Sequence, residues 1–329
     1  MDYILGIDQG STNTRAAVMD SNGSIVSYRA GEGSYFPRYG VEASMGLVMA
    51  TVQGALKDAS ISADDLGVVV AGVSGIDFNG DELLIHNALK DRFAHQDIVA
   101  CNDCEIAFYS GTTKFVGAVL CAGTGSNAGF FAPDGRKFVM SDYIKQSLQG
   151  GSAIAVRAIE AVFESEIGMW PETGLTGAFL DFAGAGSVGE LLKRYMKEEG
   201  FSTRTKYMVP QILELAQSGD TVARVVLSAF ADDLCACFSA AMDKMGMLEL
   251  DCDIVLAGSV FTGRANILTG MVTERLSRYA ENANIISARF EPVIGACIMG
   301  LRKKRGDYDE QAALNTAISA IKLGLTRAV

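Results

Sequence analysis

Short apolar runs separated by turn residues make up the first third of the chain. Two stretches with apolar residues at helical spacing, 45–59 and 82–93, lie between the runs and predict helices. The pair Asn22-Gly23 predicts a tight hairpin turn. The remaining runs predict strands, at residues 3–7, 15–19, 24–30, 68–73 and 98–101. A hairpin meander is therefore followed by strands that alternate with helices.

The second part of the chain has fewer strands and longer helices. Apolar runs at 116–120 and 253–256 predict strands, and Pro133-Asp134-Gly135 predicts a hairpin turn after the first of them. Apolar and amphipathic stretches predict helices at residues 151–165, 188–199, 209–218, 220–245, 293–301 and 310–325.

This order of elements predicts an α/β protein with two domains. A chain of 329 residues with 49% hydrophobic content can bury a full core, and its length suggests about two domains. We place the boundary near residues 110–115. The N-terminal domain is then 1–112, joined by the last helix at 308–329, and the C-terminal domain is 113–307.

A polar turn joins the first two predicted strands, with the sequence Ile7-Asp8-Gln9-Gly10-Ser11-Thr12-Asn13-Thr14-Arg15. Backbone N–H groups of Gly10, Ser11 and Thr12 can point at phosphate oxygens, and the hydroxyl groups, including that of Thr14, add donors. Asp8 can hold a hydrated Mg²⁺ beside them. Taken alone, this segment is explained equally well as a polar hairpin turn.

Two later turns offer the same kind of surface. The segment 120–129 follows a predicted strand and has closely spaced glycines with a hydroxyl between them, in Gly123, Thr124 and Gly125. It predicts a second phosphate loop. The strand at 254–257 ends in small residues, Gly258 and Ser259, where an adenine ring or a ribose could lie against exposed backbone.

In this order and spacing the loops resemble the phosphate-1, phosphate-2 and adenosine motifs of the actin-like ATPase superfamily. Within it the chain most resembles the BadF/BadG/BcrA/BcrD ATPase family and its N-acetylglucosamine kinase branch. The resemblance is carried by Val73-Ser74-Gly75-Ile76-Asp77, Asn102-Asp103, Gly123-Thr124-Gly125-Ser126-Asn127 and Glu291-Pro292-Val293-Ile294-Gly295-Ala296. It spans essentially the whole chain and implies two ribonuclease-H-like domains facing an interdomain nucleotide cleft.

The resemblance also implies an activity, the ATP-dependent phosphorylation of a sugar hydroxyl with Mg²⁺. The sugar it implies is N-acetylglucosamine or a related amino sugar. Asp103 follows the strand at 98–101, where an open sheet presents its ligand-facing residues. By resemblance it is the general base that takes the proton of the sugar hydroxyl, and Asp8 reaches Mg²⁺ through water. Capping of a following helix is the alternative role for Asp103.

Three side chains are expected to bind the sugar by resemblance, those of Asp77, Asn102 and Asn127. Asp77 could instead form an Asx-turn with the residues that follow it. Arg15 either adds positive charge to the phosphate site or lies exposed on its strand. Ser11, Thr12, Thr14, Thr124 and Gly125 are expected at phosphate, and Gly258 and Ser259 beside adenosine, with Gly263 and Glu291 as weaker candidates there.

One segment departs from the family pattern. N-acetylglucosamine kinases usually carry Gly-Asp-Glu-Gly-Ser ahead of a helix, and this chain has Leu148-Gln149-Gly150-Gly151-Ser152. Both acidic residues are absent, so groups able to bind hydroxyls or orient water are missing. A different sugar, a weak kinase, or a nucleotide-binding regulatory protein without kinase activity are the alternatives that this change leaves open.

The cysteines raise a further alternative, because other members of this ATPase family are activators of dehydratases and reductases and carry an iron–sulfur cluster. Cys101 and Cys104 form a C-x-x-C, and Cys235 and Cys237 a second close pair. Clusters and zinc generally need four ligands, which a dimer could supply. Against this, the residues around both pairs predict a buried strand and an apolar helix, where Cys behaves as a small hydrophobe.

Charge and composition indicate which partners and which cellular location to expect. The chain has 28 Lys and Arg against 39 Asp and Glu, a net charge of −11. Its basic cluster, residues 302–305, is expected to be a solvated helix end, so nucleic acid and anionic membranes are poor candidate partners. We found neither a secretory signal nor an apolar stretch of ~18 residues, and the seven scattered Cys suit a reducing compartment, which predicts a cytoplasmic protein.

A homodimer is expected by resemblance and from the apolar helix at 222–247, which is rich in Ala, Leu, Cys and Met. Burial of the same helix in the core of its own domain is the alternative.

Overall fold

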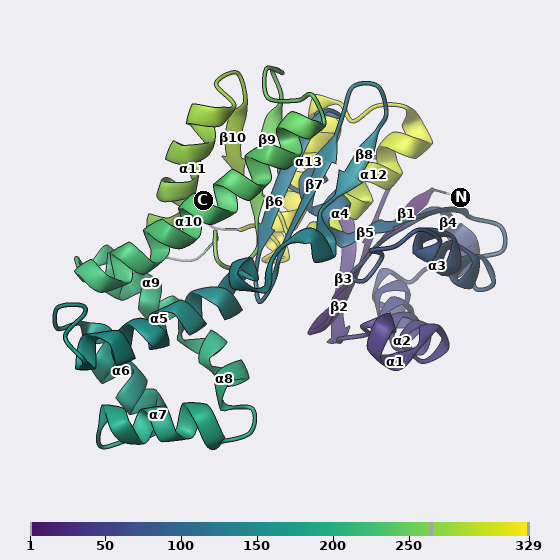
Figure 1. Ribbon diagram of the computed structural model, residues 1–329. Helices are drawn as coiled ribbons and strands as arrows, with labels where there is room; N and C mark the ends of the chain where they lie inside the picture. The colour runs from purple at the N-terminus through teal and green to yellow at the C-terminus, as the bar shows by residue number, and fades with distance from the viewer. Residues whose placement is uncertain (1, 263–265, 328–329) are drawn as a thin grey trace. The chain divides into compact units, whose positions relative to one another are not determined.

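The computed structural model describes residues 2–262 and 266–327 of the chain. Its contacts divide the chain into two compact units, which can be followed by residue number in Figure 1. Unit 1 consists of Met1–Phe115 and Ala288–Val329, and unit 2 of Val116–Ser287. Each unit is built around one five-stranded sheet with helices packed against it, which confirms the predicted α/β class.

The sheet of unit 1 has the predicted meander at one side and parallel strands at the other. Its strand order is β3-β2-β1-β4-β5; β2 is antiparallel to β1 and β3, whereas β1, β4 and β5 run parallel. The strands are β1 (Tyr3–Gln9), β2 (Asn13–Met19), β3 (Ile25–Glu32), β4 (Leu66–Val73) and β5 (Asp97–Asn102).

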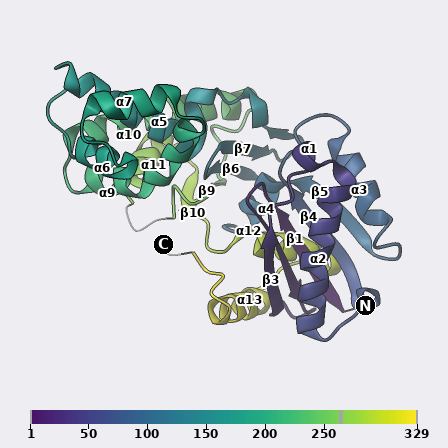
Figure 2. The ribbon, with the colours of Figure 1, turned by 90° about the horizontal axis from the view of Figure 1, so that it is seen from below.

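Helices cover both faces of this sheet. They are α1 (Phe36–Tyr39), α2 (Val41–Ala59), α3 (Asp81–Lys90), α4 (Asp103–Tyr109), α12 (Pro292–Arg305) and α13 (Glu310–Lys322), with a short 3₁₀ helix at Ala63–Asp65. Side chains alternate along β1, so Leu5 and Ile7 pack in the cluster with α2 and α3, whereas Ile4 packs in the cluster with α12. Figure 2 shows α2 and α3 on one side of the sheet and α12 on the other.

The position of α12 differs from the domain boundaries predicted from sequence. We expected 113–307 to form one domain, but Ala288–Val329 belongs to unit 1. Glycines on α12 allow a close approach to this unit: a Cβ at Gly295 would lie 1.9 Å from the backbone oxygen of Ile106 in α4, and a Cβ at Gly300 would lie 2.4 Å from the side chain of Ile4. The helix is therefore part of the core of unit 1.

Unit 2 repeats the sheet topology of unit 1. Its strand order is β10-β9-β6-β7-β8, with β6 and β9 and then β9 and β10 parallel, and with β7 antiparallel to β6 and β8. The strands are β6 (Gly117–Ala122), β7 (Ser126–Phe131), β8 (Lys137–Val139), β9 (Asp253–Ala257) and β10 (Asn284–Ser287). The hairpin turn predicted at Pro133-Asp134-Gly135 connects β7 to β8.

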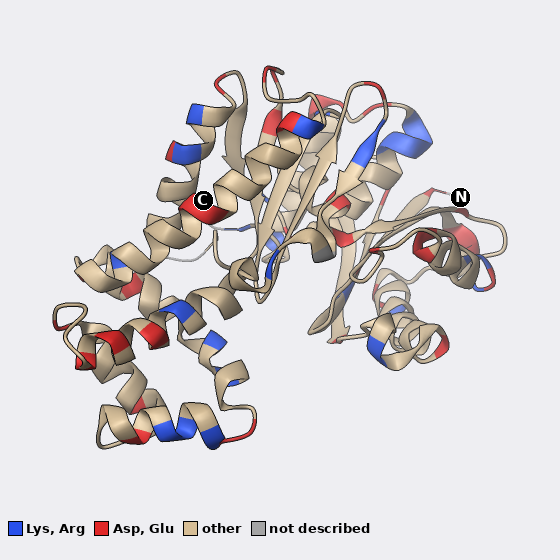
Figure 3. Ribbon diagram, viewed as in Figure 1, with Lys and Arg blue, Asp and Glu red and all other residues tan. Residues whose placement is uncertain are grey.

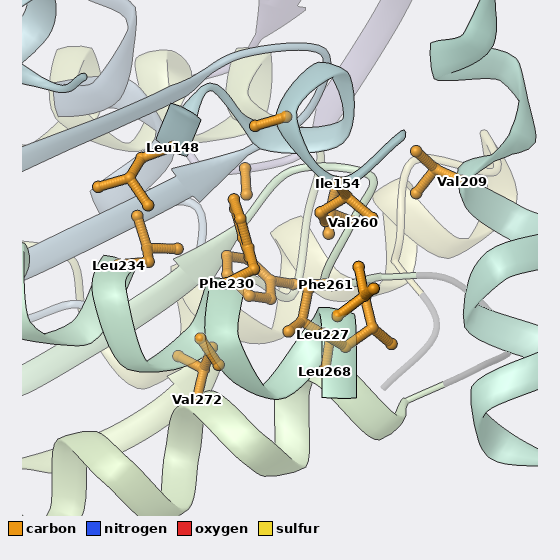
Figure 4. Close-up of a cluster of buried hydrophobic side chains, with 14 of the residues drawn as sticks. Leu148, Ile154, Val209, Leu227, Phe230, Leu234, Val260, Phe261, Leu268 and Val272 are labelled. Carbon is orange, nitrogen blue, oxygen red and sulfur yellow. The ribbon is translucent and has the colours of Figure 1, made fainter. Parts of the chain in front are cut away.

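The helices of unit 2 form one hydrophobic core with its sheet. They are α5 (Gly150–Glu166), α6 (Gly174–Ala183), α7 (Val188–Lys197), α8 (Phe201–Arg204), α9 (Val209–Gln217), α10 (Thr221–Lys244) and α11 (Ile267–Tyr279), with 3₁₀ helices at Ser141–Tyr143, Gln146–Leu148 and Thr205–Met208. Figure 4 shows Phe230 of α10 among core side chains that include Ile154 of α5 and Leu268 of α11. Helices α6, α8 and α11 and strand β10 were not predicted from the sequence.

Helix α10 is a core helix of unit 2. Leu227, Phe230, Leu234 and Phe238 are at most 2% exposed, so the composition of this helix no longer supports a dimer interface. By length and composition α10 could also cross a membrane, with a mean hydropathy of 1.6 over 18 residues, of which 56% are buried inside the protein. Core helices of soluble proteins meet the same criterion, so a single helix of this kind is weak evidence.

The basic cluster at the end of α12, visible in Figure 3, makes ion pairs within unit 1. Lys303 Nζ lies 3.2 Å from a carboxylate oxygen of Asp97, and Arg305 lies 2.8 Å from Asp309. The cluster also stabilises the negative end of the helix dipole.

Candidate functional site

Three parallel strands of unit 1 end at the same level, and the acidic residues predicted for catalysis lie at this edge. The register pairs Gln9 with Val73 and Val73 with Asn102. Asp8 is therefore near the end of β1, Asp77 lies in the loop after β4, and Asp103 begins α4 directly after β5. The carboxyl edge of an open sheet is where such folds bind ligands.

Asp103 is partly exposed and its carboxyl group is hard to ionise. Burial raises its pKa to about 7, and the negative charges of Asp8 and Asp77 contribute to the increase. The backbone N–H groups of Cys104 and Asp103 oppose it. A carboxylate with a pKa near neutrality can accept a proton and release it again at physiological pH. This is the property required of a general base.

The side chain of Asn102, whose contact with the sugar stays a prediction, makes hydrogen bonds within unit 1. Asn102 is the N-cap of α4, and its Oδ1 accepts a hydrogen bond from Cys104 N at 3.0 Å, so Asp103 does not hold the N-cap position. Its Nδ2 donates to Ile76 O at 2.9 Å and to Asp77 Oδ1 at 3.3 Å. The buried amide therefore ties the loop after β4 to the end of β5 and fixes the position of Asp77.

The loop after β4 is further shaped by the side chain of Asp81. Asp81 Oδ2 accepts hydrogen bonds from the backbone N–H groups of Asp77, at 3.2 Å, and Phe78, at 2.9 Å. Asp77 is partly exposed. Its carboxylate thus lies at the surface of the sheet edge, beside Asn102 and within electrostatic range of Asp103.

The predicted phosphate-1 loop is a tight turn with exposed polar residues. Gly10 N donates to Asn13 O at 3.0 Å, and Ser11 and Thr12 are exposed. Thr14 differs from expectation, because its side chain is fully buried and its hydroxyl lies 2.7 Å from that of Ser34. We therefore remove Thr14 from the candidate phosphate ligands.

Asp8 is held in an ion network of unit 1. Arg15 Nη1 lies 3.2 Å from Asp8 Oδ2, and Arg15 Nε lies 4.0 Å from Glu291 Oε2. Burial and the charge of Glu291 raise the pKa of Asp8, whereas Arg15 lowers it. Glu291 belongs to unit 1, where it contacts Arg15 and Arg327, and its place beside adenosine stays a prediction.

The donor set at this edge fits Mg²⁺, which prefers oxygen ligands and usually keeps several waters. Asp8, Asp77 and Asp103 offer carboxylate oxygens. Among residues 2–262 and 266–327, however, no group of three His, Cys, Asp or Glu side chains is arranged to hold a metal ion alone. A Mg²⁺ ion here would therefore depend on phosphate oxygens and water for most of its ligands.

The predicted phosphate-2 loop of unit 2 is attached to the start of α5 by backbone hydrogen bonds. Gly151 N donates to Gly123 O at 2.8 Å, and Ser152 N donates to Thr124 O at 3.1 Å. Gln149 Oε1 accepts from Ser126 N at 3.1 Å. Thr124 and Gly125 are exposed at the tip of the loop.

Gly150 explains why this chain departs from the family pattern at this point. Its φ is +47°, and a Cβ added to it would lie 2.3 Å from Gly125 O and 2.6 Å from Gly123 O. A side chain at position 150 would collide with the phosphate-2 loop. The glycine that replaces an acidic residue is therefore required by this backbone, and a Glu there would need a different loop.

The side chain of Asn127, whose contact with the sugar stays a prediction, makes hydrogen bonds within unit 2. Its Oδ1 accepts hydrogen bonds from Ala128 N at 2.8 Å and Ser141 N at 2.9 Å. The bond from Ser141 N attaches β7 to the segment that follows β8. The carbonyl group of Asn127 therefore orders the chain beside the phosphate-2 loop.

The predicted adenosine loop lies against the phosphate-2 loop within unit 2. Val260 N donates to Ala122 O at 3.0 Å, and a Cβ at Gly123 would lie 3.9 Å from Ser259 Oγ. Gly258 has a φ of +100°, and a Cβ there would lie 2.3 Å from Ala122 O. The prediction for Gly263 falls outside the described residues.

A cavity of ≈530 Å³ opens between these two loops and α9. The residues from 206 to 214 that form its far wall were not predicted from the sequence, because no motif marks them. The cavity has an apolar wall and a few polar groups, which is typical of a site for a small ligand. Its lining residues are Gly123, Thr124, Gly151, Lys206, Tyr207, Val209, Pro210, Leu213, Glu214, Ser259 and Val260.

Burial of the cysteine pairs favours a structural role. Cys101, Cys104 and Cys235 are at most 3% exposed. Burial raises the pKa of the Cys235 thiol to about 12, and it raises the pKa of Cys237 as well. A raised pKa disfavours the thiolate form that binds metals.

Comparison with known proteins finds that this chain is similar in sequence to sugar kinases. It is 23% identical over 322 residues to the N-acetyl-D-glucosamine kinase of Dictyostelium discoideum, covering 92% of this chain and 99% of that protein. It is 26% identical over 243 residues to the glucosamine kinase GspK of Vibrio cholerae serotype O1, covering 71% of this chain and 78% of that protein.

The fold is shared with solved structures. A candidate N-acetylglucosamine kinase from Chromobacterium violaceum superposes with a TM-score of 0.66 at 20% identity, over 91% of this chain and 99% of that one. This likeness shows the actin-like ATPase fold. The sequence pattern of the BadF/BadG/BcrA/BcrD ATPase family matches residues 5–300. The chain therefore belongs to the BadF/BadG/BcrA/BcrD ATPase family.

Proposed function

We propose that the protein is a kinase that transfers the γ-phosphate of Mg-ATP to a hydroxyl of N-acetylglucosamine or a related amino sugar. The observation that carries this proposal is Asp103, a partly exposed carboxyl group with a pKa raised to about 7 at the carboxyl edge of a parallel sheet. Its neighbours there, Asp77 and Asp8, suit a ligand rich in hydroxyl groups and a hydrated cation. Relatives named as N-acetyl-D-glucosamine kinase and glucosamine kinase support the class of sugar.

In the proposed reaction, Asp103 accepts the proton of the sugar hydroxyl. The sugar oxygen forms a bond to the γ-phosphorus, and the bond from that phosphorus to the bridging β–γ oxygen breaks, which releases ADP. Mg²⁺, when bound, neutralises negative charge on the phosphates. Because the bond changes occur on the substrates, the protein contributes mainly by positioning and by charge.

Asp77 is the proposed sugar-binding side chain, with its carboxylate as acceptor for sugar hydroxyl groups. Asn102 is proposed as a positioning residue, because its amide holds Asp77 and caps the helix that begins with Asp103. The sugar hydroxyl that reacts would thus be oriented by two carboxylates whose separation is fixed through one buried amide.

Nucleotide binding is assigned to the loops. In unit 1, the backbone of Gly10, Ser11 and Thr12 would contact phosphate, with Asp8 beside the metal. In unit 2, Thr124 and Gly125 would contact phosphate, and the cavity beside Ser259 would hold adenosine. Its apolar wall, with Val209, Pro210 and Leu213, suits the face of a purine ring. A cytoplasmic location and a homodimer remain predictions.

The test is ADP release by purified protein with Mg-ATP across a panel of hexoses, N-acetylhexosamines and amino sugars. The proposal predicts release that depends on N-acetylglucosamine or a close relative, with little release when no sugar is present. In Asp103→Asn the sugar-dependent rate should fall by roughly 10²–10⁴-fold, whereas a matched substitution of an exposed aspartate, Asp243→Asn, should leave it unchanged. ADP release that is independent of every sugar would overturn the proposal.

A further inference from the structure

Four charged side chains from distant parts of the sequence form a connected row in unit 1. Arg15 Nη1 lies 3.2 Å from Asp8 Oδ2, and Arg15 Nε lies 4.0 Å from Glu291 Oε2. Arg327 Nη2 lies 2.9 Å from the same Glu291 oxygen. Exposed fractions of these side chains range from 9% for Asp8 to 27% for Arg15, so the pairs are shielded from water more than surface ion pairs are.

Backbone hydrogen bonds hold the end of this row in place. Thr326 pairs with Phe290 in an antiparallel bridge. Arg327 N donates to Arg289 O at 2.9 Å, and Glu291 N donates to Leu325 O at 3.0 Å. The segment at 325–327 is thus fixed along the chain that leads into α12, which directs Arg327 onto Glu291.

Arg15 occupies the central position, between two carboxylates that compete for one guanidinium group. Its contact with Asp8 is close, whereas its contact with Glu291 is long. The second cation, Arg327, contacts Glu291 closely and partly satisfies its charge. The strength of the bond between Arg15 and Asp8 should therefore depend on how fully Arg327 neutralises Glu291.

We infer that Arg15 is a positioning residue shared between Asp8 and Glu291, and that Arg327 and Glu291 together set how readily Asp8 accepts a hydrated Mg²⁺ ion beside bound nucleotide. The inference rests on the proposed function only in assigning Asp8 to the metal. Asp8 bound firmly by Arg15 is a poorer partner for the ion. Asp8 held loosely is a better one.

Substitutions at the two ends have opposite expected effects. In Arg327→Gln, Glu291 loses its close cation and draws Arg15 away from Asp8, so Mg²⁺ should contribute more to nucleotide binding. In Glu291→Gln, Asp8 is the one carboxylate of the row that remains for Arg15, so Mg²⁺ should contribute less. In the double variant, Glu291 has no charge to neutralise, and the result should match that of Glu291→Gln alone.

The measurement is the dissociation constant of a non-hydrolysable ATP analogue, with and without Mg²⁺, for the wild type and each variant. The ratio of the metal-free to the Mg²⁺ value gives the contribution of the ion without any turnover. We expect this ratio to rise roughly three- to tenfold in Arg327→Gln and to fall by a similar factor in Glu291→Gln and in the double variant.

If only the net charge near Asp8 matters, a different set of ratios is expected. The change in net charge also raises the ratio in Arg327→Gln and lowers it in Glu291→Gln, but it returns the double variant to the wild-type value, because the lost charges cancel. That result would overturn the inference. Matched controls are Arg29→Gln and Asp58→Asn, which break another ion pair of unit 1, with Nη2 2.9 Å from Oδ1, and should leave the ratio unchanged.

Thermal unfolding of every variant separates loss of fold from loss of metal binding. If the end of the chain has only a structural role, Arg327→Gln and Glu291→Gln will lower the melting temperature and change the ratio in the same direction, which also overturns the inference. If the ratio of the metal-free to the Mg²⁺ dissociation constant is one in the wild type, Mg²⁺ does not contribute to nucleotide binding, and the assignment of Asp8 to a metal site is wrong. Sugar-dependent ADP release measured in parallel then shows whether the kinase proposal stands without it.

Discussion

At the scale of single residues, the proposed reaction depends on the protonation of Asp103. Its raised pKa of about 7 means that a large fraction of the carboxyl groups is protonated, and unable to act as a base, below neutral pH. We expect kcat/KM for the sugar to fall about tenfold per pH unit as the pH decreases below about 7. The measurement is the pH profile of kcat/KM from pH 5 to 8.5 at saturating Mg-ATP.

Two controls make this profile informative. Circular dichroism at each pH confirms that the protein stays folded, and the coupling enzymes are replaced by direct detection of ADP so that their own pH dependence does not enter. A flat profile between pH 5.5 and 8 would contradict the assignment of a base with a raised pKa.

The sequence predicts the positions of residues that lie at strand ends. It does not predict the positions of residues whose place depends on the direction of the side chain. The position of Asp103 at the end of a strand is predicted by the apolar run that precedes it. Thr14 was assigned to phosphate by its place in a motif, but alternation along β2 turns it to the same face as the buried Ala16 and Val18. The contact of Arg327 with Glu291 joins segments with no local signal, and only the folded chain shows it.

At the scale of elements, the packing of α5 against the phosphate-2 loop depends on Gly150. Its φ is positive, and a Cβ at this position would collide with Gly125 O, so there is no space for a side chain. We expect Gly150→Ala to destabilise unit 2 by roughly 1–3 kcal/mol and to weaken nucleotide binding. Gly177 in α6 is a matched control, because a Cβ there meets nothing within 4 Å.

The two variants should move stability in opposite directions. Gly177→Ala should stabilise its helix by about 0.5–1 kcal/mol, whereas Gly150→Ala should lower the midpoint of urea unfolding. Equal midpoints for Gly150→Ala and the wild type would show that the loop relaxes without cost. The sequence identified this segment only as a departure from a family pattern, since the φ value that makes the glycine necessary is a property of the folded loop.

At the scale of the whole molecule, the two units use different parts of the chain from those predicted. The sequence order suggested a C-terminal domain of 113–307, but α12 packs into the core of unit 1. Most strands and most long helices were predicted because their apolar patterns are local. The assignment of α12 to unit 1 was not predicted, because it depends on contacts of Gly295 and Gly300 with residues far away in sequence.

This division predicts how pieces of the chain behave. A fragment of residues 116–287 contains the whole of unit 2 and should unfold cooperatively and remain monomeric. A fragment of 113–307 also carries α12, whose apolar face would lose its partners in unit 1 and promote aggregation. Light scattering and thermal unfolding of the two fragments test this, and equal behaviour of both would contradict the assignment of α12.

The most direct test of sugar phosphorylation follows the γ-phosphate itself. Protein, N-acetylglucosamine and ATP labelled in the γ-phosphate are mixed in the presence of Mg²⁺, and the label is separated into sugar phosphate and inorganic phosphate. The account predicts that the wild type transfers label to the sugar and that Asp103→Asn, although folded, does not. Label found only in inorganic phosphate, or equal transfer by Asp103→Asn, would contradict it.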